Sequence, residues 1–240
     1  MTEGGNMVLL GTIVNALTII LGTFIGKFLS KIPENMKGTV MKGIGLTVIV
    51  LGLQMAIKSS NFLIVIISIV FGAVLGELID LDDKLNILGK WIEKKIGNGS
   101  EGNISQGFVT ATLIFVIGAM AIIGALDSGI RGDHDVLYTK AIIDGFTALI
   151  LTTTLGIGVM FSAIPVFIYQ GFIALFATQI NRVVPTELME VFITEMTAVG
   201  GIMIFAIGLN LADITKIRVA NLLPGILIVA IIVTLLHFIS

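Results

Sequence analysis

Charged residues are scarce in this chain of 240 residues, which argues against a soluble protein. Asp, Glu, Lys and Arg make up 12% of the sequence, against about 25% in a typical soluble domain. Apolar residues make up 56%, and the mean hydropathy is +1.08. A soluble fold of this length needs more polar groups on its surface than the sequence supplies. We therefore predict an integral membrane protein.

Cysteine is absent, which excludes disulfides, thiolate metal sites and a cysteine nucleophile. The net charge is only -2, and no block rich in Lys and Arg indicates a nucleic-acid partner. Asp133, His134 and Asp135 are consecutive, and consecutive loop residues seldom direct all three side chains to one ion. We expect no cofactor, no metal site and no nucleic acid, and we expect the lipid bilayer as the surrounding partner.

The sequence also lacks a convincing catalytic pattern. Ser162 has no evident histidine partner, because both histidines lie at the ends of predicted helices. Two aspartates such as Asp127 and Asp144 can share a proton, as in aspartyl proteases. However, the glycines of Gly129-Ile-Arg-Gly-Asp133 do not fit the Gly-x-Gly-Asp pattern of intramembrane aspartyl proteases. We expect that the protein is not an enzyme.

Long apolar runs dominate what is present. A helix needs roughly 20 apolar residues to cross about 30 Å of hydrocarbon. Six runs suit one span each, at residues 8–29, 43–57, 62–79, 108–126, 192–211 and 222–239. Residues 141–180 are too many for one span and should divide near Pro165. We predict an all-α bundle of seven or eight transmembrane helices in a single membrane domain, residues 1–240.

The basic residues favour eight spans with both termini outside. Cytoplasmic loops are enriched in Lys and Arg. With eight spans and an outer N-terminus, the inner loops receive ten of the 14 Lys and Arg residues. If residues 141–180 cross only once, the inner loops receive nine.

Residues 81–96 form an amphipathic pattern. Leucines and isoleucines recur every three or four residues, at Leu81, Leu85, Leu88, Ile92 and Ile96. Four lysines and Trp91 lie among the remaining positions of this segment. The pattern predicts a helix that lies on the cytoplasmic membrane surface. Two roles stay open for it: a plain connector, or an element for gating or partner binding.

The two ends of the chain are weakly similar. When Pro33 is set against Pro185, small residues align, and after a slip of one helical turn Gly45 and Gly52 align with Gly201 and Gly208. This alignment predicts repeats at 8–79 and 165–239, with inverted orientations and glycine-broken helices, a plan common in secondary transporters.

Two GxxxG patterns begin at Gly22 and Gly72. Small residues at this spacing let helices approach closely. They predict compact packing within the chain or association between chains, and we expect a homo-oligomer.

Polar residues inside apolar runs are the candidate binding residues, because such groups usually face a bundle interior or a water-filled cavity. Asp144 is the strongest candidate, although Lys140 stands four residues before it and a local ion pair is an equally good reading. The other candidates, each with a packing or interfacial alternative, are Asn15, Gln54, Asn210, Asp127 and Glu195.

Several local sequences resemble a known family. Residues 118–158 contain Gly-Ala-Met-Ala-Ile-Ile-Gly, then Gly-Asp, then Lys-Ala-Ile-Ile-Asp-Gly-Phe-Thr, and residues 11–15 read Gly-Thr-Ile-Val-Asn. In these stretches the chain is similar to the uncharacterised YdfK/YqgA-like family of bacterial membrane proteins. The resemblance implies a multi-pass protein of the bacterial inner membrane and brings no settled substrate. It draws attention to Asn15, Asp127, Asp133 and Asp144.

We expect a transporter or channel for a small ion or solute. The segments outside the predicted spans are short, so a soluble catalytic or sensory domain has no room. Acidic sites suit a cation or protons, whereas the amino ends of unwound helices suit an anion. The alternative is a membrane scaffold or regulator that docks through residues 81–96.

Overall fold

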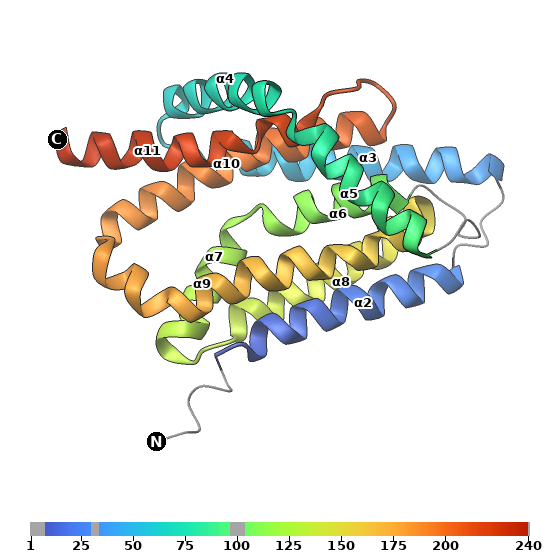
Figure 1. The fold of residues 1–240 in the computed structure, drawn as a ribbon, viewed down its shortest axis with the longest axis horizontal. Coiled ribbons are helices and arrows are strands. Elements are labelled where there is room, and N and C mark those ends of the chain that lie inside the picture. The colour runs from blue at the N-terminus through green and yellow to red at the C-terminus, as the bar shows by residue number, and fades with distance from the viewer. Residues whose placement is uncertain (1–7, 30–33, 97–103, 240) are drawn as a thin grey trace. The chain divides into compact units, whose positions relative to one another are not determined.

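The computed structural model describes residues 8–29, 34–96 and 104–239, and in this part of the chain the regular structure is entirely helical. This confirms the predicted all-α class. Figure 1 labels the α-helices, and two short 3₁₀ helices, η1 and η2, complete the set of elements. They are α2 (Leu10–Leu29), α3 (Glu34–Ala56), α4 (Phe62–Ile79), α5 (Leu81–Ile96), α6 (Ile104–Val116), α7 (Ala119–Arg131), α8 (Asp135–Leu155), η1 (Gly156–Ser162), α9 (Ala163–Val183), α10 (Thr186–Leu211), η2 (Val219–Leu222) and α11 (Pro224–Ile239).

The length and apolar character of these helices agree with the predicted membrane class. Six described segments are long and apolar enough to cross a bilayer, or seven if the bent pair α6 and α7 forms one span. The six are Leu10–Leu29, Gly38–Ala56, Phe62–Ile79, Asp135–Val183, Thr186–Leu211 and Val219–Ile239.

The chain forms two compact units, and each takes segments from distant parts of the sequence. Unit 1 draws on Met1–Lys37, Leu88–Val116 and Met120–Val183. Unit 2 draws on Gly38–Ile87, Ile117–Ala119 and Val184–Ser240. The predicted repeats do not coincide with these units, and the predicted internal symmetry stays a prediction.

In unit 1, α2 packs on α8 through glycines. A Cβ atom added at Gly22 would lie 2.1 Å from the carbonyl oxygen of Gly145, and one at Gly26 would lie 2.4 Å from that of Leu149. Any larger residue would force the helices apart. The first GxxxG pattern therefore serves packing within the chain.

The long segment Asp135–Val183 folds back on itself at η1 (Figure 1). Asn15 on α2 hydrogen-bonds both Asp144 on α8 and Gln170 on α9. These two partners are 26 residues apart (170 minus 144), and a straight helix would separate them by about 39 Å. The fold-back agrees with the predicted division near Pro165, and α8 and α9, at 21 residues each, are each long enough to cross a bilayer.

The predicted span at 108–126 is not one continuous helix. The chain instead forms α6 and α7, which are bent by 62° relative to each other. Gly118 lies in the break with a φ of +144°, a conformation that glycine adopts readily and other residues rarely do. The break falls in the middle of the apolar run.

In unit 2, α3 packs on α10 and α4 packs on α11, again through glycines. A Cβ atom at Gly52 would lie 2.3 Å from the backbone nitrogen of Phe205. One at Gly72 would lie 2.4 Å from that of Gly225. The second GxxxG pattern therefore also serves packing within the chain.

The amphipathic segment is a helix with the predicted bounds, α5. Its residue Ile92 is buried with Ile104 and Phe108 of α6 in unit 1. Trp91 is 57% exposed, and the ammonium of Lys95 lies 5.6 Å from its ring centre. The position of α5 on a membrane surface stays a prediction.

Candidate functional site: a buried polar cluster in unit 1

Four polar side chains meet inside unit 1, and we call them the Asp144 cluster. They are Asn15 on α2, Lys140 and Asp144 on α8, and Gln170 on α9. All four residues are buried. Polar groups of this kind are rare inside membrane helices and often mark the pathway of a substrate or ion.

The Asp144 carboxylate receives hydrogen bonds from two side chains. The Nζ atom of Lys140 lies 2.9 Å from Oδ1 and 2.8 Å from Oδ2. The Nδ2 atom of Asn15 donates to Oδ2 at 3.0 Å. The local ion pair expected between positions 140 and 144 is therefore formed, but it is buried and shares its carboxylate with a second helix.

The same amide group of Asn15 also reaches α9. Its Nδ2 atom donates to Oε1 of Gln170 at 3.3 Å. Asn15 thus connects all three helices of the cluster. Both hydrogen bonds come from the NH₂ group, and the Oδ1 atom of Asn15 has no hydrogen-bond partner among the described residues.

Further polar atoms around the cluster also lack partners. Within the described part of the chain, neither Nε2 of Gln170 nor Oγ1 of Thr12 makes a hydrogen bond. Thr12 stands three residues before Asn15, on the same face of α2, and it is fully buried. A buried polar atom without a partner carries a free-energy cost, so these atoms are suited to receive a ligand or water.

Glycines explain how short side chains reach one another here. Gly145 follows Asp144 directly and contacts the backbone of Gly22 and Thr18 on α2. This close approach brings the α2 backbone near α8. The short side chain of Asn15 can then hydrogen-bond Asp144 without a water between them.

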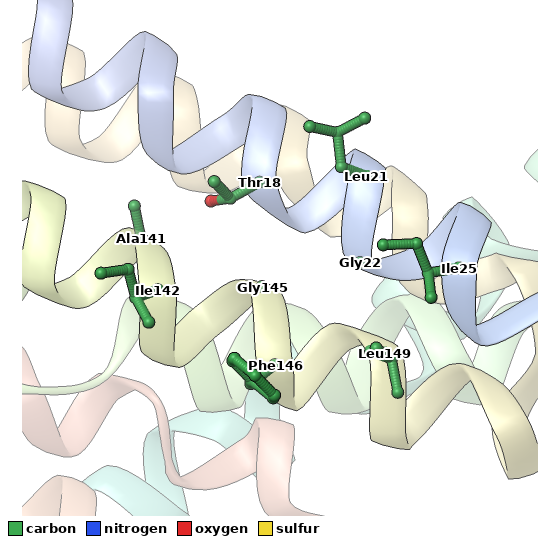
Figure 2. Close-up of a pocket in the computed structure, with 9 residues that line it drawn as sticks. All are labelled: Thr18, Leu21, Gly22, Ile25, Ala141, Ile142, Gly145, Phe146 and Leu149. Carbon is green, nitrogen blue, oxygen red and sulfur yellow. The ribbon is translucent and has the colours of Figure 1, made fainter.

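An apolar groove runs along the outside of the same helix pair. Figure 2 shows α2 and α8 side by side, with Gly22 and Gly145 between the apolar side chains. The groove has a volume of about 260 Å³, and its lining includes Thr18, Leu21, Phe146 and Leu149. None of the four cluster residues lines it. The groove is therefore a surface suited to lipid, separate from the polar site.

Glu195 occupies a second buried site, in unit 2. It is fully buried on α10, and its carboxylate accepts four hydrogen bonds from the turn before α4. The donors are Ser59 Oγ at 2.6 Å, Ser60 N at 2.9 Å, Ser60 Oγ at 2.7 Å and Asn61 N at 2.9 Å. Glu195 is therefore not a solvated residue of the first helical turn, because it lies well inside α10 and its carboxylate binds the turn before α4.

The remaining candidate residues have other surroundings. Gln54 is exposed on α3. Asn210 braces the turn after α10: it donates to the carbonyl of Ile217 and accepts from the backbone of Ile217 and the hydroxyl of Thr215. Asp127 pairs with Arg131 one turn along α7. Of the six predicted residues, the structure therefore brings only Asn15 and Asp144 into contact.

Sequence reasoning missed Gln170 and Thr12. Gln170 interrupts an apolar stretch, Phe-Ile-Tyr-Gln-Gly-Phe at 167–172, and this position was a signal of the same kind as Asn15. Thr12 carried no such signal, because threonine is common in transmembrane helices. Its burial beside the cluster appears only in the folded chain.

Comparisons with known proteins agree with the resemblance seen in the sequence. A family model described as a protein of unknown function, DUF554, matches residues 10–234. The chain is 33% identical to the uncharacterized membrane protein YdfK of Bacillus subtilis, over 95% of this chain and 96% of that protein. It is 29% identical to the uncharacterized protein YqgA of Escherichia coli, over 91% of this chain and 94% of that protein. No solved structure matches.

Proposed function

The chain belongs to the DUF554 family, and on that premise we propose that this membrane protein moves a small ion or small solute across the bilayer. The observation that carries the proposal is the Asp144 cluster. Its charges and amides are buried within helices whose outer surfaces are apolar.

The energetic cost of the cluster supports a functional role. Removing an ammonium and a carboxylate from water costs several kcal/mol for each ion, and their attraction offsets this only when the geometry is excellent. An apolar pair of similar volume is often at least as stable. The pair between Lys140 and Asp144 is therefore a poor choice for stability alone, and it suits a protein that handles a polar solute.

The location of the cluster supports a pathway. Asp144 lies nine residues beyond the start of α8, or about 14 Å along the helix axis. Gln170 lies in the interior of α9. A solute that reaches these side chains has entered the apolar part of the helices. A regulator that acts at the membrane surface does not require such an entry.

The test is reconstitution of the purified protein into liposomes, with flux of Na⁺, K⁺, H⁺ and Cl⁻ compared with empty liposomes. We expect flux of at least one of these ions above the empty-liposome rate. If none of the four exceeds that rate, and a panel of small organic solutes also stays at it, the transport proposal is contradicted.

A scaffold or regulator is the second candidate, and the exposed side chains of α5 favour it. Leu88 is 44% and Trp91 57% exposed, so this helix has apolar side chains available to a partner or a membrane surface. A scaffold predicts that Trp91→Ala disturbs the function in cells while Asp144→Asn is harmless. The transport proposal predicts the reverse order of effects.

We propose the bacterial inner membrane as the location, with the chain as a multi-pass protein, because the two relatives come from bacteria and one is named a membrane protein.

We further propose that the chain associates with copies of itself and has no enzymatic activity. Chemical crosslinking in native membranes tests the association, and a monomer at all protein concentrations would contradict it.

A further inference from the structure

We propose that the Asp144 cluster is a binding site for a monovalent cation, and that the Lys140 ammonium is a tethered competitor that occupies the site when the cation is absent. This inference rests on the proposed transport function and names its substrate class. It starts from the position of Nζ, which lies within 3 Å of both oxygens of the Asp144 carboxylate.

The oxygen atoms around Lys140 form a suitable set of ligands. Hard cations bind carboxylate, amide and hydroxyl oxygens. The cluster offers both Asp144 oxygens and Oε1 of Gln170. It also offers Oδ1 of Asn15 and Oγ1 of Thr12, the two buried oxygens without partners. An incoming cation would therefore gain ligands that Lys140 leaves unused.

The charge of the cluster selects a monovalent ion. One carboxylate balances one positive charge, and Lys140 already supplies that charge in the present arrangement. A divalent ion needs more acidic ligands. In the described residues no group of three or more His, Cys, Asp and Glu side chains is arranged to hold a metal ion.

The unpaired donor in the cluster is consistent with a partly hydrated ion. The Nε2 atom of Gln170 has no acceptor among the described residues, and a cation itself cannot accept a hydrogen bond. A water molecule carried by the cation can bind the ion through its oxygen and accept a hydrogen bond from this amide.

The Lys140 ammonium neutralises the Asp144 carboxylate when no cation is bound. An uncompensated carboxylate buried at this depth is strongly unfavourable. When Lys140 replaces the departing cation, Asp144 stays neutralised. Cation binding therefore requires that the Lys140 ammonium turns away from the carboxylate or releases its proton, because the cation, Lys140 and Asp144 together would carry a net charge of +1.

The experiment measures cation binding in detergent, so it does not depend on transport. Purified variants are titrated with NaCl, KCl or LiCl at constant ionic strength, with N-methylglucamine chloride as the balancing salt, and the thermal unfolding midpoint is recorded. Lys140→Met removes the competitor and should tighten the apparent affinity for at least one of these ions by about tenfold or more. Lys140→Met combined with Asp144→Asn should remove the cation dependence.

A matched pair of variants keeps the test valid if Lys140→Met does not fold. Thr12 and Thr23 are both fully buried on α2, and both hydroxyls lack partners within the described chain. Thr23 lies eight residues beyond Asn15, about 12 Å along the helix. In an otherwise wild-type protein, Thr12→Val should weaken cation binding, whereas Thr23→Val should leave cation binding unchanged.

Two results would overturn the inference: equal cation affinity in the Lys140→Met variant and the wild type, or equal effects of Thr12→Val and Thr23→Val. The proposed function fails separately. If cation binding depends on Asp144 but no flux occurs in liposomes, the transport proposal is contradicted and the cation site still stands. If flux occurs without cation binding, the cation site is contradicted and the transport proposal still stands.

Discussion

The backbone N–H of Asn61 donates to Oε1 of Glu195 at 2.9 Å, although 134 positions separate the two residues. Asn61 is also the N-cap of α4 and accepts a hydrogen bond from Leu63 N through its own side chain. The carboxylate of α10 therefore sits at the positive end of the α4 dipole, where a negative charge is stabilising. This contact joins α4 to α10 within unit 2.

Glu195→Gln should destabilise the protein. A glutamine keeps one acceptor oxygen but loses the negative charge, and its NH₂ group would replace Oε2, which now accepts from the Ser59 hydroxyl. We expect a loss of about 2–3 kcal/mol, the scale of hydrogen bonds to a buried charged group. The measurement is the unfolding midpoint in detergent. Glu190→Gln, at an exposed position of the same helix, is the control, and equal midpoints for the two variants would show that the contact contributes nothing.

Gly22→Ala should also destabilise, by about 1–3 kcal/mol. The added Cβ atom would lie 2.1 Å from the carbonyl oxygen of Gly145, so α2 and α8 would have to separate. Gly43→Ala is the control, because nothing lies within 4 Å of that Cβ atom. In a helix this second change should be neutral or stabilising by about 1 kcal/mol. Thermal unfolding of both variants measures the difference, and a neutral Gly22→Ala would refute the close packing.

Asn210→Ala should affect the turn after α10 and leave solute flux unchanged. The side chain holds this turn through Ile217 and Thr215, and its loss should cost about 1–2 kcal/mol. Faster proteolysis between residues 212 and 218 would report the loosened turn. Normal proteolysis together with reduced flux would instead support the predicted role of Asn210 as a binding residue.

The sequence predicted the membrane class, the bounds of α5 and three members of the buried cluster, Asn15, Lys140 and Asp144, because each depends on a local pattern. Asp144 and Asn15 stand out as polar residues within apolar runs. Their contact, across 129 positions, depends on which helices pack together, and no local pattern specifies that. Gln54 shows that the same local pattern can also occur at a residue that does not join the cluster. It has the same polar character in an apolar run, yet it lies on an exposed face of α3.

The break between α6 and α7 was missed for a related reason. Gly118 adopts a positive φ, but many glycines in transmembrane helices simply allow close packing, as Gly22 and Gly72 do. The sequence does not distinguish these two uses. Composition alone favours the continuous helix at 108–126, and the tertiary structure determines which glycine bends the chain.

The most direct test of the account is the initial rate of cation flux in liposomes that contain equal amounts of the wild type, Asp144→Asn or Asp127→Asn. The two aspartates form the same kind of ion pair, each with a basic residue four positions away, but the Asp144 pair is buried and Arg131 of the Asp127 pair is exposed. Size-exclusion profiles establish that all three proteins are folded. We predict that Asp144→Asn falls to the rate of empty liposomes while Asp127→Asn keeps the wild-type rate. A wild-type rate in Asp144→Asn would contradict the central claim that the Asp144 cluster is the transport site.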